Sequence, residues 1–220
     1  MGAVSKLLSH IVNPFHEIPR TLAAMHLAGN SGYLTKSGWL RSAVSRQAVD
    51  ADGLPLPWYT YAAIKFIGSR LRPEMSVFEY GTGHSTLWYA RRVASCLGCE
   101  HDPDWLRLVT EKLPSNATVI HRSANPVETY VSSLHDSGRQ FDVVVVDGLA
   151  RNACLNAVDS GLTASGVVIL DNSDIPEYDD GTAGMINRGF RRIDFAGLGP
   201  INAYGWTTSV LYRPQNCFGI

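Results

Sequence analysis

The stretch VFEYGTGHST, residues 77–86, decides the fold. A short apolar run contains Glu79 and is followed by two glycines, Gly81 and Gly83, with one residue between them. Glycines this close together allow a ligand or another chain segment to approach the backbone. In doubly wound α/β folds, a loop of this kind between a strand and a helix is where nucleotides bind.

The chain around this loop alternates apolar runs with helical patterns. Asp102 followed by Pro103 has the pattern of a helix N-cap and first helical position. The valines of FDVVVVDG, residues 141–148, are too apolar to face water on either side, as in a parallel strand covered on both faces. Strand-like runs lie at SVFEY, SCLGCE, ATVIH, FDVVVVDG, GVVILDN, FRRIDFAG and WTTSVLYR. We therefore predict an α/β fold with a doubly wound, mostly parallel seven-stranded sheet of Rossmann-like type.

The end of the chain departs from this alternation. After a glycine-rich link, FRRIDFAG (residues 190–197) and WTTSVLYR (residues 206–213) have the pattern of two strands with no helix between them. We predict that they pair antiparallel at the edge of the sheet, so that the last strand is antiparallel.

The first seventy-two residues form a different region. Amphipathic helices are predicted over residues 7–12, which end before a proline, and over residues 20–29, which end at a glycine. A third helix places apolar residues on one face between residues 64 and 71. We predict an N-terminal helical cap over residues 1–72, joined to a ligand-binding domain over residues 73–220. The apolar faces of the cap helices must be buried, over the cleft or against a second subunit, which makes a homodimer a candidate assembly.

Composition excludes several classes of function. The formal net charge is −1, which gives no electrostatic reason to expect a nucleic-acid partner. No apolar run reaches the length of a membrane span, and the N-terminus lacks the pattern of a signal peptide. We therefore expect a cytoplasmic protein with its four cysteines reduced. Cys96 and Cys99 form a C-x-x-C pair, but no second pair is spaced to complete a zinc site.

The residues around the glycine loop indicate its ligand. Thr86 occupies the place of the third glycine in the dinucleotide pattern, and the Glu79 carboxylate would repel a pyrophosphate. Glu100 ends the next strand, where the ribose hydroxyls of an adenosine ligand would lie. A ligand with a ribose and a cationic amino-acid part satisfies both carboxylates. S-adenosylmethionine is such a ligand.

Residues 76–213 resemble the class I S-adenosylmethionine-dependent methyltransferases. Residues 77–85 are similar to the first motif of that family, Glu100 matches its acidic residue after the second strand, and the antiparallel tail is its usual ending. The resemblance implies that Glu79 and the loop hold the methionine end, with Ser85 near its carboxylate, and that the HRSAN loop contacts adenine. The implied cofactor-binding residues are Glu79, Gly81, Thr82, Gly83, Ser85, Glu100, Ser123 and Asp147.

A second group of polar residues follows the fourth and fifth strands. Asp147 closes FDVVVVDG, and Asp171 with Asn172 closes GVVILDN. Hard oxygen ligands at neighbouring strand ends suit Mg²⁺ or another hard divalent cation. The pattern resembles the cation-dependent O-methyltransferases of the catechol, caffeoyl-CoA and macrolide-sugar type. That resemblance implies a metal held by Asp147, Asp171 and Asn172, with Asp147 and Asp171 catalytic. The alternative is that Asp147 contacts only the cofactor while Asp171 and Asn172 cap a turn.

The general base is left open by the sequence. Catechol-type enzymes carry a lysine three residues after the first aspartate, and this chain has Ala150 there, followed by Arg151. Arginine stays protonated and is a poor base. The candidates for the base are His84, His101 and Asp174.

The predicted function is O-methylation of a small-molecule or glycan hydroxyl. A nucleic-acid acceptor is disfavoured because no N/D-P-P-Y/F motif follows the fourth strand. Trp58, in the stretch PWYTY, either lines the acceptor pocket or packs between the cap and the core. Two alternatives stay open: a catalytically inactive adenosyl-binding scaffold, and a nicotinamide-dependent oxidoreductase.

Overall fold

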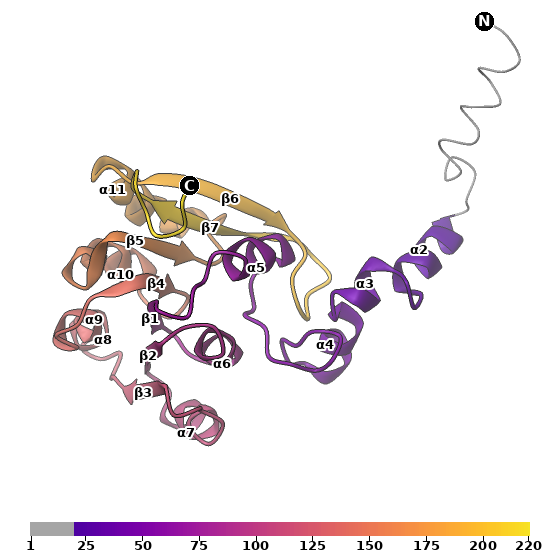
Figure 1. Ribbon diagram of the computed structural model, residues 1–220, viewed down its shortest axis with the longest axis horizontal. Coiled ribbons are helices and arrows are strands. Elements are labelled where there is room, and N and C mark those ends of the chain that lie inside the picture. The colour runs from indigo at the N-terminus through magenta and orange to yellow at the C-terminus, as the bar shows by residue number, and fades with distance from the viewer. Residues whose placement is uncertain (1–19) are drawn as a thin grey trace, which may run out of the picture.

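The computed structural model describes residues 20–220, which form a sheet covered by helices on both faces (Figure 1). The strands are β1 Ser76–Tyr80, β2 Ser95–Glu100, β3 Ala117–His121, β4 Phe141–Val146, β5 Leu162–Leu170, β6 Arg191–Gly197 and β7 Trp206–Tyr212. The α-helices are α2 Arg20–Ala28, α3 Tyr33–Lys36, α4 Trp39–Ser45, α5 Tyr61–Gly68, α6 His84–Ala90, α7 Pro103–Thr110, α8 Val127–Val131, α9 Ser133–Asp136, α10 Arg151–Ala157 and α11 Asp179–Asn187. Two 3₁₀ turns, Val158–Ser160 and Pro176–Tyr178, complete the set. Within residues 20–220, none of these helices has the length and apolar character needed to cross a bilayer.

The sheet has seven strands in the order β3-β2-β1-β4-β5-β7-β6. Strands β1 to β5 pair in parallel, and β7 runs antiparallel to both β5 and β6. The predicted fold class and the antiparallel last strand are confirmed. The last strand inserts between β5 and β6, so that β6 lies at the edge of the sheet.

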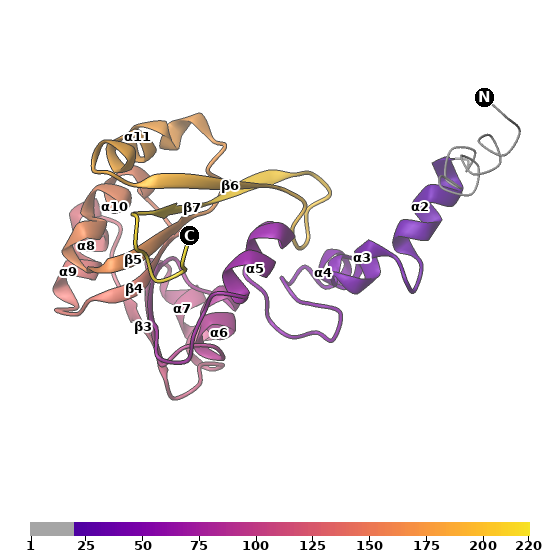
Figure 2. The same cartoon turned by 45° about the horizontal axis from the view of Figure 1, so that its top comes forward.

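Alternate residues of the central strands fill two separate hydrophobic layers. Val143 and Val145 pack with helices α5 and α6 on one face. Val144 and Val146 pack with helices α8 to α11 on the other face (Figure 2). All four valines are fully buried, which explains why this strand is apolar from Val143 to Val146.

The strand order reverses between β1 and β4, and the site of ligand binding in such sheets is the crevice at this reversal. The chain turns sharply there at Gly81, whose φ of +85° is rarely adopted by other residues. A Cβ atom at Gly81 would lie 2.9 Å from the Cα of Gly148, so the two loops after β1 and β4 touch. Only glycine allows this approach.

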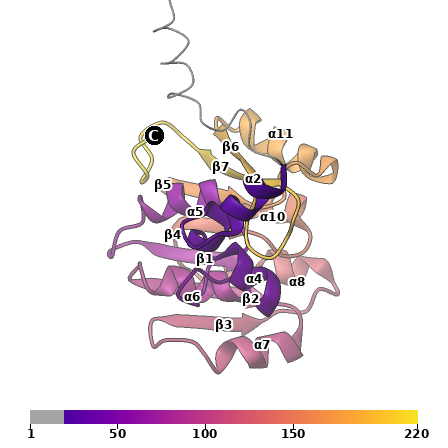
Figure 3. The same cartoon turned by 90° about the vertical axis from the view of Figure 1, so that its right-hand side faces the viewer.

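The N-terminal region divides into two parts. Helix α4 and the segment after it contact the body, where the indole of Trp39 donates to the carbonyl of Asn202 at 2.7 Å. Helix α2 confirms the helix predicted over residues 20–29, but residues 21–28 are exposed and the helix projects away from the sheet (Figures 1 and 2). In Figure 3, which faces this side of the molecule, α2 lies in front of the sheet. The helix predicted over residues 7–12 lies outside the described residues. The division of the chain at residue 72 stays a prediction.

The prediction of a glycine-rich link before β6 is wrong, because the chain forms helix α11 there. This helix is tied to α10: the backbone N–H of Gly181 donates to Oδ1 of Asn152 at 3.0 Å, and Met185 is buried beneath it. A Cβ atom on Gly181 would lie 2.6 Å from that same oxygen. The glycine is therefore present for close packing between helices, which outweighs its low helix propensity.

Candidate active site

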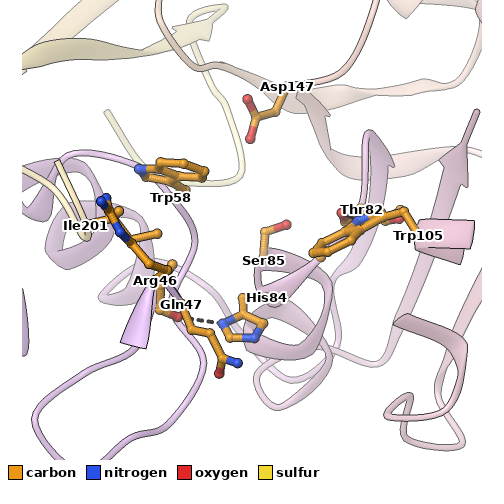
Figure 4. Close-up of a pocket in the computed structure, with 11 residues that line it drawn as sticks. Arg46, Gln47, Trp58, Thr82, His84, Ser85, Trp105, Asp147 and Ile201 are labelled. Carbon is orange, nitrogen blue, oxygen red and sulfur yellow. Dashed lines mark hydrogen bonds between the residues drawn. The ribbon is translucent and has the colours of Figure 1, made fainter. Parts of the chain in front are cut away.

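A cavity of about 200 Å³ opens beside the glycine loop at the carboxyl end of β1. The loop and the start of α6 form one wall, and the N-terminal segment before α5 forms the opposite wall. Figure 4 shows Trp58 and Trp105 on opposite sides of this cavity with Ser85 between them. The lining residues are Arg46, Gln47, Ala48, Trp58, Thr82, Gly83, His84, Ser85, Trp105, Asp147 and Ile201. We call this space the loop cavity.

Glu79 lies buried beneath the loop with an incomplete set of partners. Among the described residues, its Oε1 atom has no hydrogen-bond partner, and Oε2 has only a long contact of 3.7 Å from the thiol of Cys96. Burial raises the pKa of Glu79 to about 7, and the hydroxyls of Thr86 and Ser85 oppose this rise. A buried carboxylate oxygen without a donor is costly. A donor such as an ammonium group would satisfy this oxygen, although Glu79 is not among the residues that line the loop cavity.

Glu100 is held beside the glycine loop at the end of β2, and its contact with a ribose stays a prediction. Its Oε2 accepts from the backbone and hydroxyl of Thr82 at 3.2 and 3.1 Å. Its Oε1 accepts from the backbone N–H of His101 at 2.8 Å and lies 2.9 Å from the His101 ring. These donors fix the carboxylate at the end of β2, where ribose hydroxyls would compete with Thr82 and His101 for its oxygens.

Trp105 is a residue of the site that sequence reasoning missed. Its indole N–H donates to the carbonyl of Thr82 at 2.7 Å, and its ring would lie 3.5 Å from a Cβ atom on Gly83. Asp102 fixes this placement, because its side chain caps α7 and accepts from the backbone of Trp105. The sequence showed only an apolar helix position. The ring is 45 % exposed and offers a flat surface over the loop.

Ser123, the candidate for the adenine contact, is placed differently. Its hydroxyl donates to the carbonyl of Asn125 at 2.8 Å and accepts from the same residue's N–H at 3.1 Å. It therefore closes its own turn, and it is exposed rather than part of the lining of the loop cavity. The adenine contact stays a prediction.

A second cavity of about 390 Å³ adjoins the first, because Trp58 and Asp147 line both. It lies at the carboxyl ends of β4 and β5, under the loop between β6 and β7. The lining residues are Trp58, Asp147, Arg151, Asp171, Asn172, Asn202, Tyr204 and Trp206. We call it the strand-end cavity.

The guanidinium of Arg151 lies among the oxygens predicted to hold a metal. Nε donates to the Gly148 carbonyl at 3.0 Å. Nη1 donates to the Asp171 carbonyl and to Oδ1 of Asn172, the latter at 3.1 Å. Nη2 donates to the Asp147 carbonyl at 3.0 Å and lies 3.1 Å from Oδ1 of the same residue, in an ion pair. The guanidinium therefore makes four hydrogen bonds and one ion pair with protein oxygens.

This arrangement does not fit a divalent cation. Oδ1 of Asn172 and one carboxylate oxygen of Asp147 already accept from a resident positive charge. A metal ion would have to displace that charge, since two cations at this distance repel each other strongly in a partly buried site. In residues 20–220, no three His, Cys, Asp or Glu side chains gather as a metal site either.

Asp171, a predicted catalytic residue, is held by the last strand. Its Oδ1 atom accepts from the indole of Trp206 at 3.0 Å and from the hydroxyl of Thr208. Burial, and then the charge of Asp147, raises the pKa of Asp171 well above its usual range. Burial raises the pKa of Asp147 to about 6, against the opposing charge of Arg151. The two carboxyl groups are therefore harder to ionise together than two exposed aspartates are.

The three candidate bases are separated by the fold. His84 lines the loop cavity, with Nδ1 lying 2.7 Å from the Ala48 carbonyl. His101 is paired with Glu100, and Asp174 accepts from the backbone of Thr207 at 2.8 Å. Neither of these two lines the loop cavity or the strand-end cavity.

The loops around the two cavities hold several residues in the left-handed backbone region. The φ angles are +57° at Arg46, +50° at Ala150, +50° at Asn172 and +72° at Ile201. The conformation is least expected at Ile201, because its side chain branches at Cβ. Such residues persist where surrounding contacts fix them, and they concentrate at functional sites.

Comparison with known proteins places this geometry in a known fold. No protein-family model matches the chain, and no curated protein sequence matches it. Solved structures do. Precorrin-6y C5,15-methyltransferase from Geobacter metallireducens superposes with a TM-score of 0.55 at 15 % identity, over 69 % of this chain and 86 % of that one. A TehB-like S-adenosylmethionine-dependent methyltransferase from Corynebacterium glutamicum superposes with a TM-score of 0.50 at 16 % identity, over 68 % of this chain and 85 % of that one.

The chain has the class I methyltransferase fold. A third similar structure is precorrin 8w decarboxylase from Methanobacterium thermoautotrophicum. It superposes with a TM-score of 0.53 at 14 % identity, over 77 % of this chain and 97 % of that one. Its name is that of a decarboxylase. The class I methyltransferase fold therefore does not decide the reaction, and the argument for function must come from the site.

Proposed function

We propose that the protein is an S-adenosylmethionine-dependent methyltransferase that acts on a hydroxyl of a small molecule or sugar. The observation that carries the proposal is the unpaired Oε1 atom of Glu79 beneath the glycine loop. A pyrophosphate would be repelled by this carboxylate, whereas an ammonium would complete its hydrogen bonds. The same observation disfavours a nicotinamide dinucleotide as the ligand.

The residues that would hold the cofactor lie on two successive strand ends. Glu79 would take the ammonium, Ser85 the methionine carboxylate and Glu100 the ribose hydroxyls. The backbone of Gly81, Thr82 and Gly83 lets the ligand approach closely. Trp105, which the sequence did not single out, would cover the ligand from the side of α7.

The junction of the two cavities is where methyl transfer would take place. S-adenosylmethionine, when bound, supplies a methyl group on sulfur, whose carbon–sulfur bond breaks with both electrons going to sulfur while a carbon–oxygen bond forms. The acceptor hydroxyl must lose its proton. Asp147 lines both cavities, and its carboxylate is our proposed recipient of that proton. The rest of the rate enhancement would come from holding the two reactants in line.

A divalent cation bound by Asp147, Asp171 and Asn172 is the alternative that the sequence suggested. It would require the guanidinium of Arg151 to leave the oxygens that it contacts. We propose that Arg151 remains and that methyl transfer needs no metal. In this proposal Arg151 is a positioning residue, because four hydrogen bonds and an ion pair with Asp147 tie its guanidinium to the protein.

Calorimetric titration of the intact protein tests the cofactor assignment. S-adenosylmethionine and S-adenosylhomocysteine should each bind at one site, and NAD should not compete. Binding of NAD in preference to both would favour the oxidoreductase alternative. Binding of S-adenosylmethionine without methyl transfer to any member of a hydroxyl-acceptor library would favour the scaffold alternative.

A further inference from the structure

We infer that the strand-end cavity binds a neutral sugar and presents one of its hydroxyls to the loop cavity. The inference rests on the proposed methyltransferase function and narrows its acceptor. It is drawn from three properties of the cavity: its position, the charge of its lining and the distribution of its aromatic rings.

The position of the strand-end cavity makes it the acceptor site. It shares Trp58 and Asp147 with the loop cavity, so a molecule bound in one touches the same side chains as a molecule bound in the other. Its remaining lining comes from the start of α10, the loop after β5, the β6–β7 loop and the first residue of β7, and includes neither Glu79 nor Glu100. The cofactor would therefore leave this space to a second molecule.

The charge of the lining disfavours an anionic acceptor. Arg151 is the one cationic side chain among the residues that line this cavity, and four hydrogen bonds and an ion pair with Asp147 already tie its guanidinium to protein oxygens. The other charged groups there are the carboxyls of Asp147 and Asp171. A phosphate, sulfate or carboxylate would find no uncommitted cation in this part of the described chain. A neutral ligand avoids the cost of burying an unpaired charge.

The aromatic rings leave flat surfaces for a ligand. Trp58 is 47 % exposed and Tyr204 is 66 % exposed, whereas Trp206 is buried and its N–H is committed to Asp171. Tyr204 and Trp206 meet edge to face, with ring centroids 6.3 Å apart. Exposed aromatic faces of this kind pack against apolar C–H surfaces, and the electron-rich face of the ring favours hydrogens that carry partial positive charge. A pyranose ring carries such C–H groups on its faces.

The polar side chains supply the complementary contacts. Within residues 20–220, the side-chain amide of Asn202 and the amide N–H groups of the Asn172 side chain have no hydrogen-bond partner. An amide offers both donors and an acceptor, which suits hydroxyls that do both. Both residues are held in place, since the Asn202 carbonyl accepts from Trp39 and Oδ1 of Asn172 accepts from Arg151.

A flat aromatic diol fits this cavity less well. Such an acceptor has two neighbouring hydroxyls at one edge and would leave most of the polar lining without partners, at a cost for each buried group. Chelation by a metal, which would favour it, is opposed by Arg151. Polar groups spread around the cavity, with rings at its mouth, match a molecule whose hydroxyls are distributed around its edge.

Saturation-transfer NMR on the intact protein loaded with S-adenosylhomocysteine tests the inference. The probes are the neutral methyl pyranosides of the common hexoses, 6-deoxyhexoses and pentoses, with catechol and methyl glucuronide as comparison ligands. We expect signal from at least one neutral pyranoside and none from the other two. Methyl transfer from S-adenosylmethionine to that pyranoside should then yield its O-methyl ether and S-adenosylhomocysteine.

Variants separate the two cavities. Tyr204→Ala should weaken pyranoside binding by about tenfold, because it removes the exposed ring, whereas Tyr204→Phe should keep it. Both should leave the calorimetric affinity for S-adenosylhomocysteine unchanged. Trp105 lines the loop cavity but not the strand-end cavity. Trp105→Ala should therefore weaken binding of S-adenosylhomocysteine and leave pyranoside binding unchanged.

The outcomes are distinguishable. Binding of catechol or the glucuronide in place of neutral sugars overturns the inference, and so does the absence of any pyranoside signal from protein that binds S-adenosylhomocysteine. The proposed methyltransferase function survives either result. If S-adenosylhomocysteine itself fails to bind, the proposed function and the inference fall together.

Discussion

The two cavities of the site differ in how far apart in the chain their proposed functional groups lie. Most of the groups proposed to hold the cofactor come from one continuous part of the chain, residues 79–105, although the lining of the loop cavity also includes residues between positions 46 and 201. The strand-end cavity gathers residues from position 58 to position 206. The first could be identified from local sequence because the glycine loop and its carboxylates are close in the chain, whereas the second exists only after the fold has brought distant segments together.

The cavities also differ in how their charges are satisfied. Beneath the loop, the Oε1 atom of Glu79 is unpaired among the described residues. At the strand ends, four hydrogen bonds and an ion pair with Asp147 hold the guanidinium of Arg151. A site with an unpaired buried charge calls for a charged ligand, and a site with balanced charges suits a neutral one.

Removal of the Arg151 side chain should have the largest effect. Arg151→Ala leaves Asp147 and Asn172 without their donors and should lower the free energy of unfolding by about 3 kcal/mol. Methyl transfer should fall by more than about a hundredfold, because Asp147 loses its position. Denaturant unfolding and initial rates measure the two losses. Arg151→Lys keeps the charge but not the planar fork, so it should recover only part of each. Unchanged activity in Arg151→Ala would show that Arg151 is not needed to position Asp147.

Burial of Glu79 should make stability depend on pH. Its pKa rises from 4.5 to about 7 on folding, so the unfolded chain ionises first. The contribution of Glu79 to the free energy of unfolding is fully present below pH 4.5, and it declines by about 3 kcal/mol as the pH rises to 7. Unfolding of Glu79→Gln, which carries no titrating group at this position, should lack this part of the slope. The same slope in both proteins would show that Glu79 is not the group responsible.

Cofactor affinity should depend on Glu100 by a smaller amount. Glu100→Ala should weaken S-adenosylmethionine binding by about 1.5–3 kcal/mol, because a carboxylate that accepts from hydroxyls is removed. Glu128→Ala, on the exposed surface of α8, is a matched control that should bind as the wild type does. Calorimetry compares the three proteins. If Glu100→Ala retains full affinity, the ribose contact is misplaced.

A chelator should have little effect on the reaction. With Arg151 in the place of a cation, EDTA should leave the methyl-transfer rate within about twofold, and added Mg²⁺ should not raise it. Loss of activity with EDTA, restored by Mg²⁺ but not by buffer exchange, would return the protein to the cation-dependent mechanism.

Deletion of residues 1–30 should have the smallest effect on the body. Residues 21–28 are exposed, so their loss should change the free energy of unfolding of the sheet by less than about 0.5 kcal/mol. The exposed apolar side chains of Leu22, Met25 and Leu27 are the reason to expect pairing with a second subunit. Sedimentation of the full and shortened chains tests that pairing. A large loss of cofactor affinity on deletion would mean that the arm reaches the site.

The glycine loop and the carboxylates beside it could be predicted from the sequence, because each is a local pattern. Apolar runs, the N-cap at Asp102 and the glycine pair depend on near neighbours, and all appear where expected. The role of Arg151 could not be predicted. Ala150 stands where catechol-type enzymes carry a lysine, but the acceptors of the Arg151 hydrogen bonds come from two strand ends that meet only in the folded sheet. Tyr204 and Asn202 were missed for the same reason, since the contact from Trp39 that holds their loop spans most of the chain.

A crystal structure grown with S-adenosylhomocysteine and Mg²⁺ is the most direct test of the account. We predict that the ligand's ammonium will lie within hydrogen-bonding distance of Oε1 of Glu79, that its ribose will contact Glu100, and that Arg151 will keep its bonds to Asp147 and Asn172. A magnesium ion held by Asp147, Asp171 and Asn172, with Arg151 displaced, would contradict the proposed mechanism. A ligand bound away from the glycine loop would contradict the assignment of the cofactor.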